Sequence, residues 1–154
     1  MIIQYHRVRN DAIKPTRGHP SDAGLDVYYC PGDFSTTAQR IEPGESALLQ
    51  TGLRFEVPHG YMLEVKNRSS VAAMRSLIVG ACVIDSGYAG EVFINLHNVG
   101  SETQMVEKGT KIAQLVMVPV ITFQAWESPD GELYEYPVTI SARGTGALGS
   151  TDAS

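Results

Sequence analysis

The sequence predicts an all-β fold, a sandwich or barrel of many short strands that contains one short helix. Its apolar residues come in short, β-branched runs, which Gly, Pro, Asn and Asp separate at fairly even spacing. Helical periodicity is nearly absent along the chain. A length of 154 residues with 43% hydrophobic content is enough for one domain with its own core.

Six apolar runs are the clearest candidate strands, and turn signals such as EPGE and SPDG separate them. In the run at 91–99, we expect the alternating residues Val92, Ile94 and Leu96 to face the core. The six predicted strands cover residues 45–57, 61–67, 76–85, 91–99, 111–126 and 132–140.

The segment SSVAAMRSL at 69–77 predicts the helix. Ser69 and Ser70 can cap its start, and the two alanines that follow are good helix formers. Arg68 stands just before them, and a guanidinium beside the free amides of a helix start suits a phosphate. A serine cap with a surface arginine explains the same residues about as well.

Composition limits the partners of the chain. The net charge of −5 and the lack of a basic stripe argue against nucleic acid. Two cysteines, Cys30 and Cys82, are too few for a disulfide framework, and the four histidines show no paired metal-ligand spacing. The first residues do not resemble a signal peptide, and the longest apolar run, 77–84, is too short for a bilayer. We expect a soluble, cytoplasmic protein with no membrane partner.

The segment VIDSGYAGE at 83–91 is the first candidate for chemistry. Asp85 ends an apolar run and precedes a glycine-containing turn, where a carboxylate can act as a general base. Tyr88 adds an aromatic surface near the same turn. Taken alone, the segment is explained better by a turn-capping aspartate and a packed tyrosine.

Two other segments carry candidate polar groups. In DAGLDV, Asp22 and Asp26 share a face if the segment is extended, and they could then hold Mg²⁺ directly or through its waters. In GTKIAQLV, Gln114 points away from its apolar neighbours, toward a ligand or toward solvent. A solvated loop edge and an exposed sheet surface are the better explanations of each segment in isolation.

The chain ends in SARGTGALGSTDAS, residues 141–154. Glycines, hydroxyls and Arg143 together can wrap phosphates with amide and guanidinium donors. Composition alone favours a loose terminus, so we expect a mobile tail.

Five segments in fixed order resemble the five motifs of the trimeric dUTPases: 23–27, 68–70, 83–91, 109–115 and 143–151. The resemblance implies a jelly-roll-like β barrel, with residues 1–142 as one domain and 143–154 as a flexible, glycine-rich lid. It also implies a homotrimer whose active sites lie at subunit interfaces.

The resemblance further implies hydrolysis of dUTP to dUMP and pyrophosphate, with Mg²⁺ on the triphosphate. Asp85 would activate the water that attacks the α-phosphorus, and Tyr88 would pack under the deoxyribose. Asp26 would support the water shell of Mg²⁺. The substrate-binding residues implied by the motifs are Arg68, Ser69, Ser70, Cys82, Ile84, Tyr88, Gln114, Arg143, Gly146, Leu148, Gly149, Ser150 and Thr151.

Some residues depart from the family pattern and keep alternatives open. Leu148 stands where the family usually has a phenylalanine, which predicts weaker closure of the lid over the base. A dCTP deaminase-like enzyme of the same fold would need a glutamate base, and Glu91 is the only glutamate near the third motif. A nucleotide-binding regulatory protein on this scaffold, or a broader nucleotide pyrophosphatase, also fits the sequence.

Overall fold

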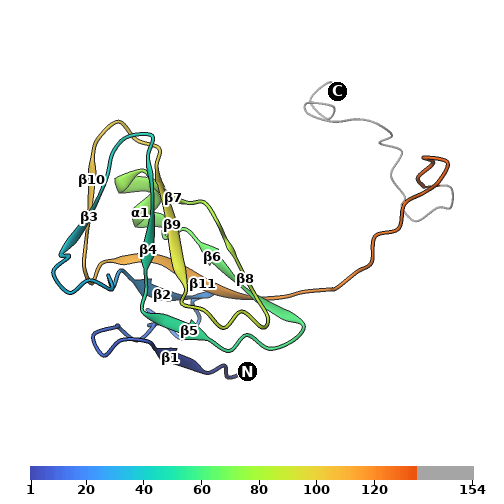
Figure 1. The fold of residues 1–154 in the computed structure, drawn as a ribbon, viewed down its shortest axis with the longest axis horizontal. Helices are drawn as coiled ribbons and strands as arrows, with labels where there is room; N and C mark the ends of the chain where they lie inside the picture. The colour runs from blue at the N-terminus through green and yellow to red at the C-terminus, as the bar shows by residue number, and fades with distance from the viewer. Residues whose placement is uncertain (135–154) are drawn as a thin grey trace. The chain divides into compact units, whose positions relative to one another are not determined.

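Antiparallel strand pairs build the part of the chain that this computed structural model describes, residues 1–134 (Figure 1). The chain divides into two compact units, Met1–Thr122 and Phe123–Ser154, and every element named here lies in the first. The elements are β1 (Tyr5–Arg7), β2 (Gly24–Tyr28), β3 (Ala38–Ile41), β4 (Ser46–Gln50), β5 (Leu53–Phe55), β6 (Tyr61–Lys66), α1 (Ser69–Arg75), β7 (Leu77–Val79), β8 (Val83–Asp85), β9 (Phe93–Asn98), β10 (Gln104–Glu107) and β11 (Lys111–Pro119).

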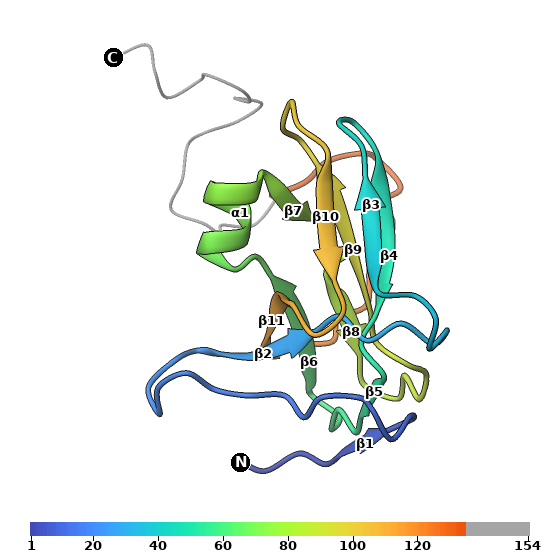
Figure 2. The ribbon, with the colours of Figure 1, turned by 90° about the vertical axis from the view of Figure 1, so that its left-hand side faces the viewer.

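The strands form four sheets. The largest has the order β2-β11-β6-β8, and the next has the order β4-β9-β7. Two smaller sheets pair β10 with β3 and β1 with β5. Figure 2 shows α1 beside β7, with β2, β11 and β6 below the helix. The predicted all-β class with one short helix is therefore what residues 1–134 adopt.

The core lies between the inward faces of these sheets. Val92, Ile94 and Leu96 are buried as predicted, and on β11 Ala113 and Leu115 are buried in the same way. Fully burying one such aliphatic side chain is worth roughly 1.5–3 kcal/mol. In this part of the chain the only helix has seven residues, and no helix is long and apolar enough to cross a membrane.

The predicted strand at 45–57 is wrong in its continuity. It divides into β4 and β5, which pair with β9 and β1 respectively. The break lies at Thr51 and Gly52, where Gly52 has a φ of +71° and the Thr51 hydroxyl donates to the Val92 carbonyl at 2.6 Å. Glycine alone adopts such a φ without strain, so the chain can turn there.

Three other predicted strands end differently. The run at 76–85 divides into β7 and β8. The run at 111–126 ends at Pro119, since proline cannot donate to a continuing ladder. The run at 132–140 is not a strand over 132–134, and its remaining residues lie outside the described part of the chain.

Three short strands were not predicted from the sequence. β1, β3 and β10 are three or four residues long and largely or partly exposed, so they lack an apolar run. The helix is where we predicted it, but its cap is not. Arg68 is the N-cap and makes no side-chain cap bond, while Ser69 and Ser70 are the first two helical residues. The predicted serine cap is therefore wrong.

Candidate active site

One group of polar side chains gathers where β2, β11 and the start of α1 meet. Asp26 on β2 accepts from Arg68 Nε at 2.8 Å through Oδ1 and from Lys111 Nζ at 2.9 Å through Oδ2. Lys111 also lies over the Tyr28 ring, 5.8 Å from its centroid. We call Asp26, Arg68, Lys111 and Gln114 the Asp26 cluster. Its two cations outnumber its one carboxylate, which suits an anionic ligand in a chain of negative net charge.

Gln114 joins the cluster through strand pairing. It lies opposite Asp26 on β2 and opposite Lys66 on β6. Its Nε2 donates to the Asn67 carbonyl at 2.9 Å, and Asn67 Oδ1 in turn accepts from the Val79 amide at 2.7 Å. A Cβ at Gly24 would lie 2.5 Å from Gln114 Oε1, so a glycine at this position leaves room for the Gln114 side-chain amide.

The Lys111 ammonium is held charged by its neighbour. The hydrogen bond to Asp26 and the negative charge of that carboxylate raise the pKa of Lys111 above its ordinary value of 10.5. Both Asp26 oxygens have cationic partners, so this carboxylate would reach a metal ion only through water. Asp22 does not share its face, because β2 begins at Gly24 and the Asp22 carboxylate accepts instead from the His19 amide.

A second group lies on loop 85–92, which connects β8 to β9, two strands of different sheets that do not pair with each other. Asp85 ends β8, its side chain is exposed, and no hydrogen bond to its carboxylate comes from residues 1–134. The Tyr88 amide donates to the Asp85 carbonyl at 3.2 Å, and Gly87, with a φ of +88°, closes the turn. The turn therefore presents a free carboxylate to water.

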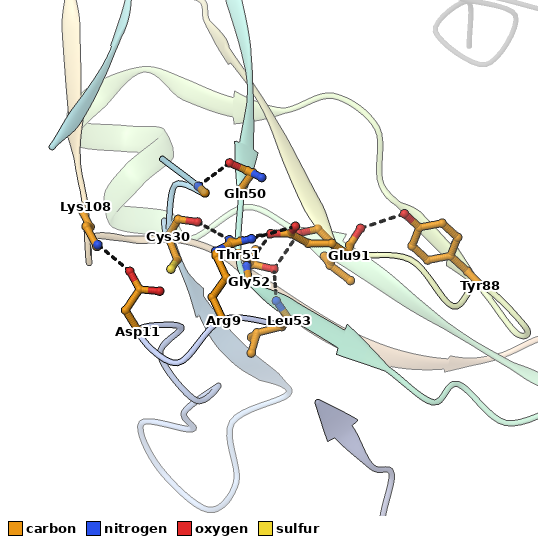
Figure 3. Close-up of polar contacts among 12 residues, drawn as sticks. Arg9, Asp11, Cys30, Gln50, Thr51, Gly52, Leu53, Tyr88, Glu91 and Lys108 are labelled. Carbon is orange, nitrogen blue, oxygen red and sulfur yellow. Dashed lines mark hydrogen bonds and ion pairs between the residues drawn. The ribbon is translucent and has the colours of Figure 1, made fainter. Parts of the chain in front are cut away.

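Tyr88 is fixed by its hydroxyl and its ring. The hydroxyl donates to the Glu91 carbonyl at 2.8 Å (Figure 3). A Cβ at Gly90 would lie 2.5–2.6 Å from the hydroxyl oxygen and the ring carbon that bears it, so the ring rests directly on the glycine. The side chain remains 46% exposed and offers its other face to a ligand.

Two residues that the motifs implied contribute mainly backbone. Ile84 is buried, so only its main chain is available to a substrate. Cys82 is half-buried, and its carbonyl already accepts from the Val65 amide at 2.8 Å. Both positions are compatible with a main chain that recognises a base, whereas the buried side chain of Ile84 cannot contact a substrate.

The Asp26 cluster and Asp85 lie at different ends of one sheet. Gln114 faces Lys66 at the end of β6, whereas Asp85 faces Met62 near its start. Gln114 and Asp85 lie two strands apart across the sheet and four residues apart along it. Their Cα atoms are therefore roughly 16 Å apart. The structure thus brings together Asp26, Arg68 and Gln114, with Ser69 and Ser70 next to Arg68, but it keeps them apart from Asp85 and Tyr88.

The remaining predicted site residues belong to the fifth motif. Arg143, Gly146, Leu148, Gly149, Ser150 and Thr151 lie outside the described residues.

A protein-family model described as dUTPase matches residues 10–149. The chain belongs to the dUTPase family. A relative from Clostridium acetobutylicum, named deoxyuridine 5'-triphosphate nucleotidohydrolase, is 38% identical over 97% of this chain and 95% of its own. A relative of the same name from Clostridium tetani is 36% identical over 94% and 92%.

Solved dUTPase structures share the fold. The dUTPase of Staphylococcus bacteriophage 80alpha, solved with dUpNHpp, has a TM-score of 0.81 and 26% identity and covers 97% of this chain and 97% of its own. The dUTPase of phage phi11 of S. aureus, whose structure shows a structural Mg(II) ion, has a TM-score of 0.74 and 25% identity over 84% and 97%. The jelly-roll-like β class implied by the motifs is thus confirmed.

Sequence reasoning missed Lys111 and the pairing of Arg9 with Glu91. Lys111 lies inside the fourth motif, three residues before Gln114, and its place in that motif could have suggested it. Arg9 and Glu91 form an ion pair between segments 82 residues apart, and no local pattern announces such a contact.

Proposed function

We propose that this chain hydrolyses dUTP to dUMP and pyrophosphate, with Asp85 as the base that activates the attacking water. Membership of the dUTPase family supports the reaction. Relatives that are named nucleotidohydrolases and match this chain over almost their whole length support it too. The exposed carboxylate of Asp85, at the turn that ends β8, is the observation that supports its role. Substitution at phosphorus needs positioning and charge neutralisation, and one base suffices for the water.

The Asp26 cluster is the proposed contact for the phosphates. Arg68 and Lys111 supply positive charge, and Gln114 supplies an amide beside them. Tyr88 would carry the deoxyribose on its free face, and the main chain around Cys82 and Ile84 would read the uracil. The glycine-rich residues 143–154 would then close over the bound nucleotide and exclude water.

Mg²⁺ would arrive with the triphosphate rather than on a cage of protein ligands. Among residues 1–134, no group of three or more His, Cys, Asp or Glu is placed to hold a metal ion. Asp26 would contact the ion through water, because Arg68 and Lys111 occupy its oxygens. When bound, the ion would neutralise charge on the phosphate oxygens. The arrangement fits a metal that is shared with substrate.

We propose that the active unit is a homotrimer with composite sites. A separation of roughly 16 Å between Gln114 and Asp85 is too long for both to contact one triphosphate within a single chain. The outward face of β4, β9 and β7 also leaves Leu48, Phe93 and Ile78 exposed, as an interface between copies would require. Two copies could bring the Asp26 cluster of one to loop 85–92 of the other.

The deaminase alternative lacks its base. The Glu91 carboxylate is 15% exposed and is already bonded to Arg9 and to the Gly52 amide. A glutamate held in this way is not free to exchange protons with a cytosine ring.

A pyrophosphate-release assay with Mg²⁺ on dUTP, dCTP, dTTP and UTP tests the proposal. We expect release from dUTP far above the other nucleotides, and no ammonia from dCTP. Asp85→Asn should abolish release while a non-hydrolysable dUTP analogue still binds. Asp33→Asn, at an exposed turn, is the matched control and should leave the rate unchanged. Turnover retained by Asp85→Asn would remove its role as base.

Mixing two inactive variants tests the composite site. Asp85→Asn and Arg68→Ala each damage a different part of it, so refolding them together should restore activity in mixed trimers. Each variant refolded alone should stay inactive. A mixture with no activity above the two separate variants would place both residues in one chain's site.

A further inference from the structure

Glu91 connects three separate parts of the chain (Figure 3). Its carboxylate accepts from Arg9 twice, Nη2 to Oε1 at 2.8 Å and Nη1 to Oε2 at 3.1 Å. The same Oε1 accepts from the Gly52 amide at 2.7 Å. The Glu91 carbonyl accepts from the Tyr88 hydroxyl. Glu91 thus connects the N-terminal segment around Arg9, the turn between β4 and β5, and the aromatic residue of loop 85–92.

Arg9 is itself held in place. Its Nη2 donates to the Cys30 carbonyl at 2.6 Å, and the side chains of Arg9 and Glu91 are 16% and 15% exposed. A Cβ at Gly52 would lie 3.1 Å from Arg9 Nη2, so the turn leaves room for the guanidinium. A pair at this depth is weakly screened, and removal of one partner leaves the other charge uncompensated.

The Tyr88 ring has few other restraints. It rests on Gly90 and its hydroxyl is bonded to Glu91, so its position follows that of the chain at 90–92. Backbone bonds fix this part of the chain to the same turn, since the Val92 amide donates to the Leu53 carbonyl at 2.8 Å. The carboxylate of Glu91 supplies the side-chain part of the attachment.

We propose that Arg9 and Glu91 are positioning residues that set the sugar selectivity of the site. The ion pair holds the end of loop 85–92, and the loop holds the Tyr88 ring against which the deoxyribose packs in the proposed function. A sugar packed against this ring would have no room for a 2′-hydroxyl. The inference rests on the proposed function, because it needs the sugar to bind against Tyr88. Neither residue touches the reacting atoms, so the chemistry at Asp85 is left intact when the pair is broken.

Glu91→Gln is the first test, because glutamine keeps the size and can still accept from Gly52 while the charge is lost. We expect kcat for dUTP to stay within about threefold, KM for dUTP to rise, and UTP to be accepted better. The ratio of kcat/KM for dUTP over UTP should fall roughly tenfold. If Glu91→Gln does not fold, Arg9→Lys keeps a charge, loses the paired donors and should lower the same ratio.

Asp11→Asn is the matched control. It breaks another ion pair of the N-terminal segment, Asp11 to Lys108 at 2.6 Å, which makes no hydrogen bond to loop 85–92. It should lower the melting temperature and leave the dUTP-to-UTP ratio unchanged. Equal loss of selectivity in Asp11→Asn and Glu91→Gln would reduce the effect to general destabilisation and overturn the proposal.

Tyr88→Phe tests whether the effect passes through the hydroxyl. It should lower the ratio in the same direction, and the combination with Glu91→Gln should lower it no further than the larger single change, because both act on one contact. An unchanged ratio in Glu91→Gln, with normal dUTP turnover by the unaltered chain, overturns the inference alone. Absence of dUTP turnover by the unaltered chain contradicts the proposed function as well.

Discussion

Asp26 and Asp85 are both aspartates of the ordered motifs, yet the fold gives them opposite surroundings. Asp26 is 15% exposed in its side chain and bonded to Arg68 and Lys111. Asp85 is exposed at the end of β8, and its carboxylate accepts no hydrogen bond from residues 1–134. A base must exchange protons with water, and a neutralised carboxylate does this poorly. Environment therefore separates the proposed structural acid from the proposed base.

The two cysteines differ in burial, since Cys82 is only half-buried. Cys30 is buried, and burial raises the pKa of its thiol above the ordinary value of 9.0. Since the thiolate is the reactive form, Cys30 is a packed core residue rather than a nucleophile.

Asp11 carries the prediction at the residue scale. The hydrogen bond from Lys108 lowers the pKa of Asp11 below its ordinary value of 3.8. A lowered folded-state pKa contributes stability that is present above pH 3.8 and is lost as pH falls through the folded value. Asp11→Asn should lower the melting temperature by about 2 °C at neutral pH. Thermal unfolding followed from neutral pH into acid should show this difference shrinking, and a difference independent of pH would contradict the ion pair.

At the scale of elements, the turn between β4 and β5 carries the chain from one sheet to another and also holds loop 85–92. Gly52 gives the turn its positive φ, the Thr51 hydroxyl donates to the Val92 carbonyl, and the Gly52 amide donates to the Glu91 carboxylate. Thr51 and Gly52 lie between the last residue of β4 and the first residue of β5, and both hold the end of loop 85–92. A sequence run that looks like one long strand therefore becomes the support of the proposed sugar site.

A substitution pair tests this turn. Gly52→Ala would put a Cβ 2.6 Å from the Ala12 Cβ in addition to the strained φ, whereas Gly44→Ala at φ +80° meets nothing within 4 Å. We expect a loss of about 3 kcal/mol for Gly52→Ala, from backbone strain and overpacking, and about 1 kcal/mol for Gly44→Ala from strain alone. Urea unfolding measures both, and equal losses would show that packing at the turn does not matter.

At the scale of the whole molecule, the sheet β2-β11-β6-β8 keeps the proposed phosphate site apart from the proposed base. That distance makes assembly part of the proposed mechanism. The negative net charge of the chain is compatible with a triphosphate ligand, because Arg68 and Lys111 make the Asp26 cluster locally positive.

Removal of residues 143–154 is the prediction at this scale. Every described strand and the helix end by Pro119, so the truncated chain should keep its circular dichroism spectrum and its oligomeric state. Turnover of dUTP should fall at least about tenfold, because the proposed lid no longer excludes water from the phosphates. Removal of 152–154 alone serves as the control. Full activity in the larger truncation would show that the tail is not a lid.

The sequence by itself determined the all-β class, the helix at α1, the buried alternation in β9 and the membership of the dUTPase family. These follow from local periodicity, turn residues and ordered motifs, which survive without knowledge of the partners of any strand. The short strands β1, β3 and β10 were not predictable in this way, because they are stabilised by their pairing and not by an apolar run.

Only the tertiary structure decided how the motif residues are grouped. Strand pairing places Gln114 beside Asp26 and far from Asp85, although all three belong to ordered motifs. It also brings Arg9 to Glu91 across 82 residues. Such contacts depend on register and long-range packing, where each side chain meets its partner only once the sheets have formed, and the order of residues along the chain does not record them.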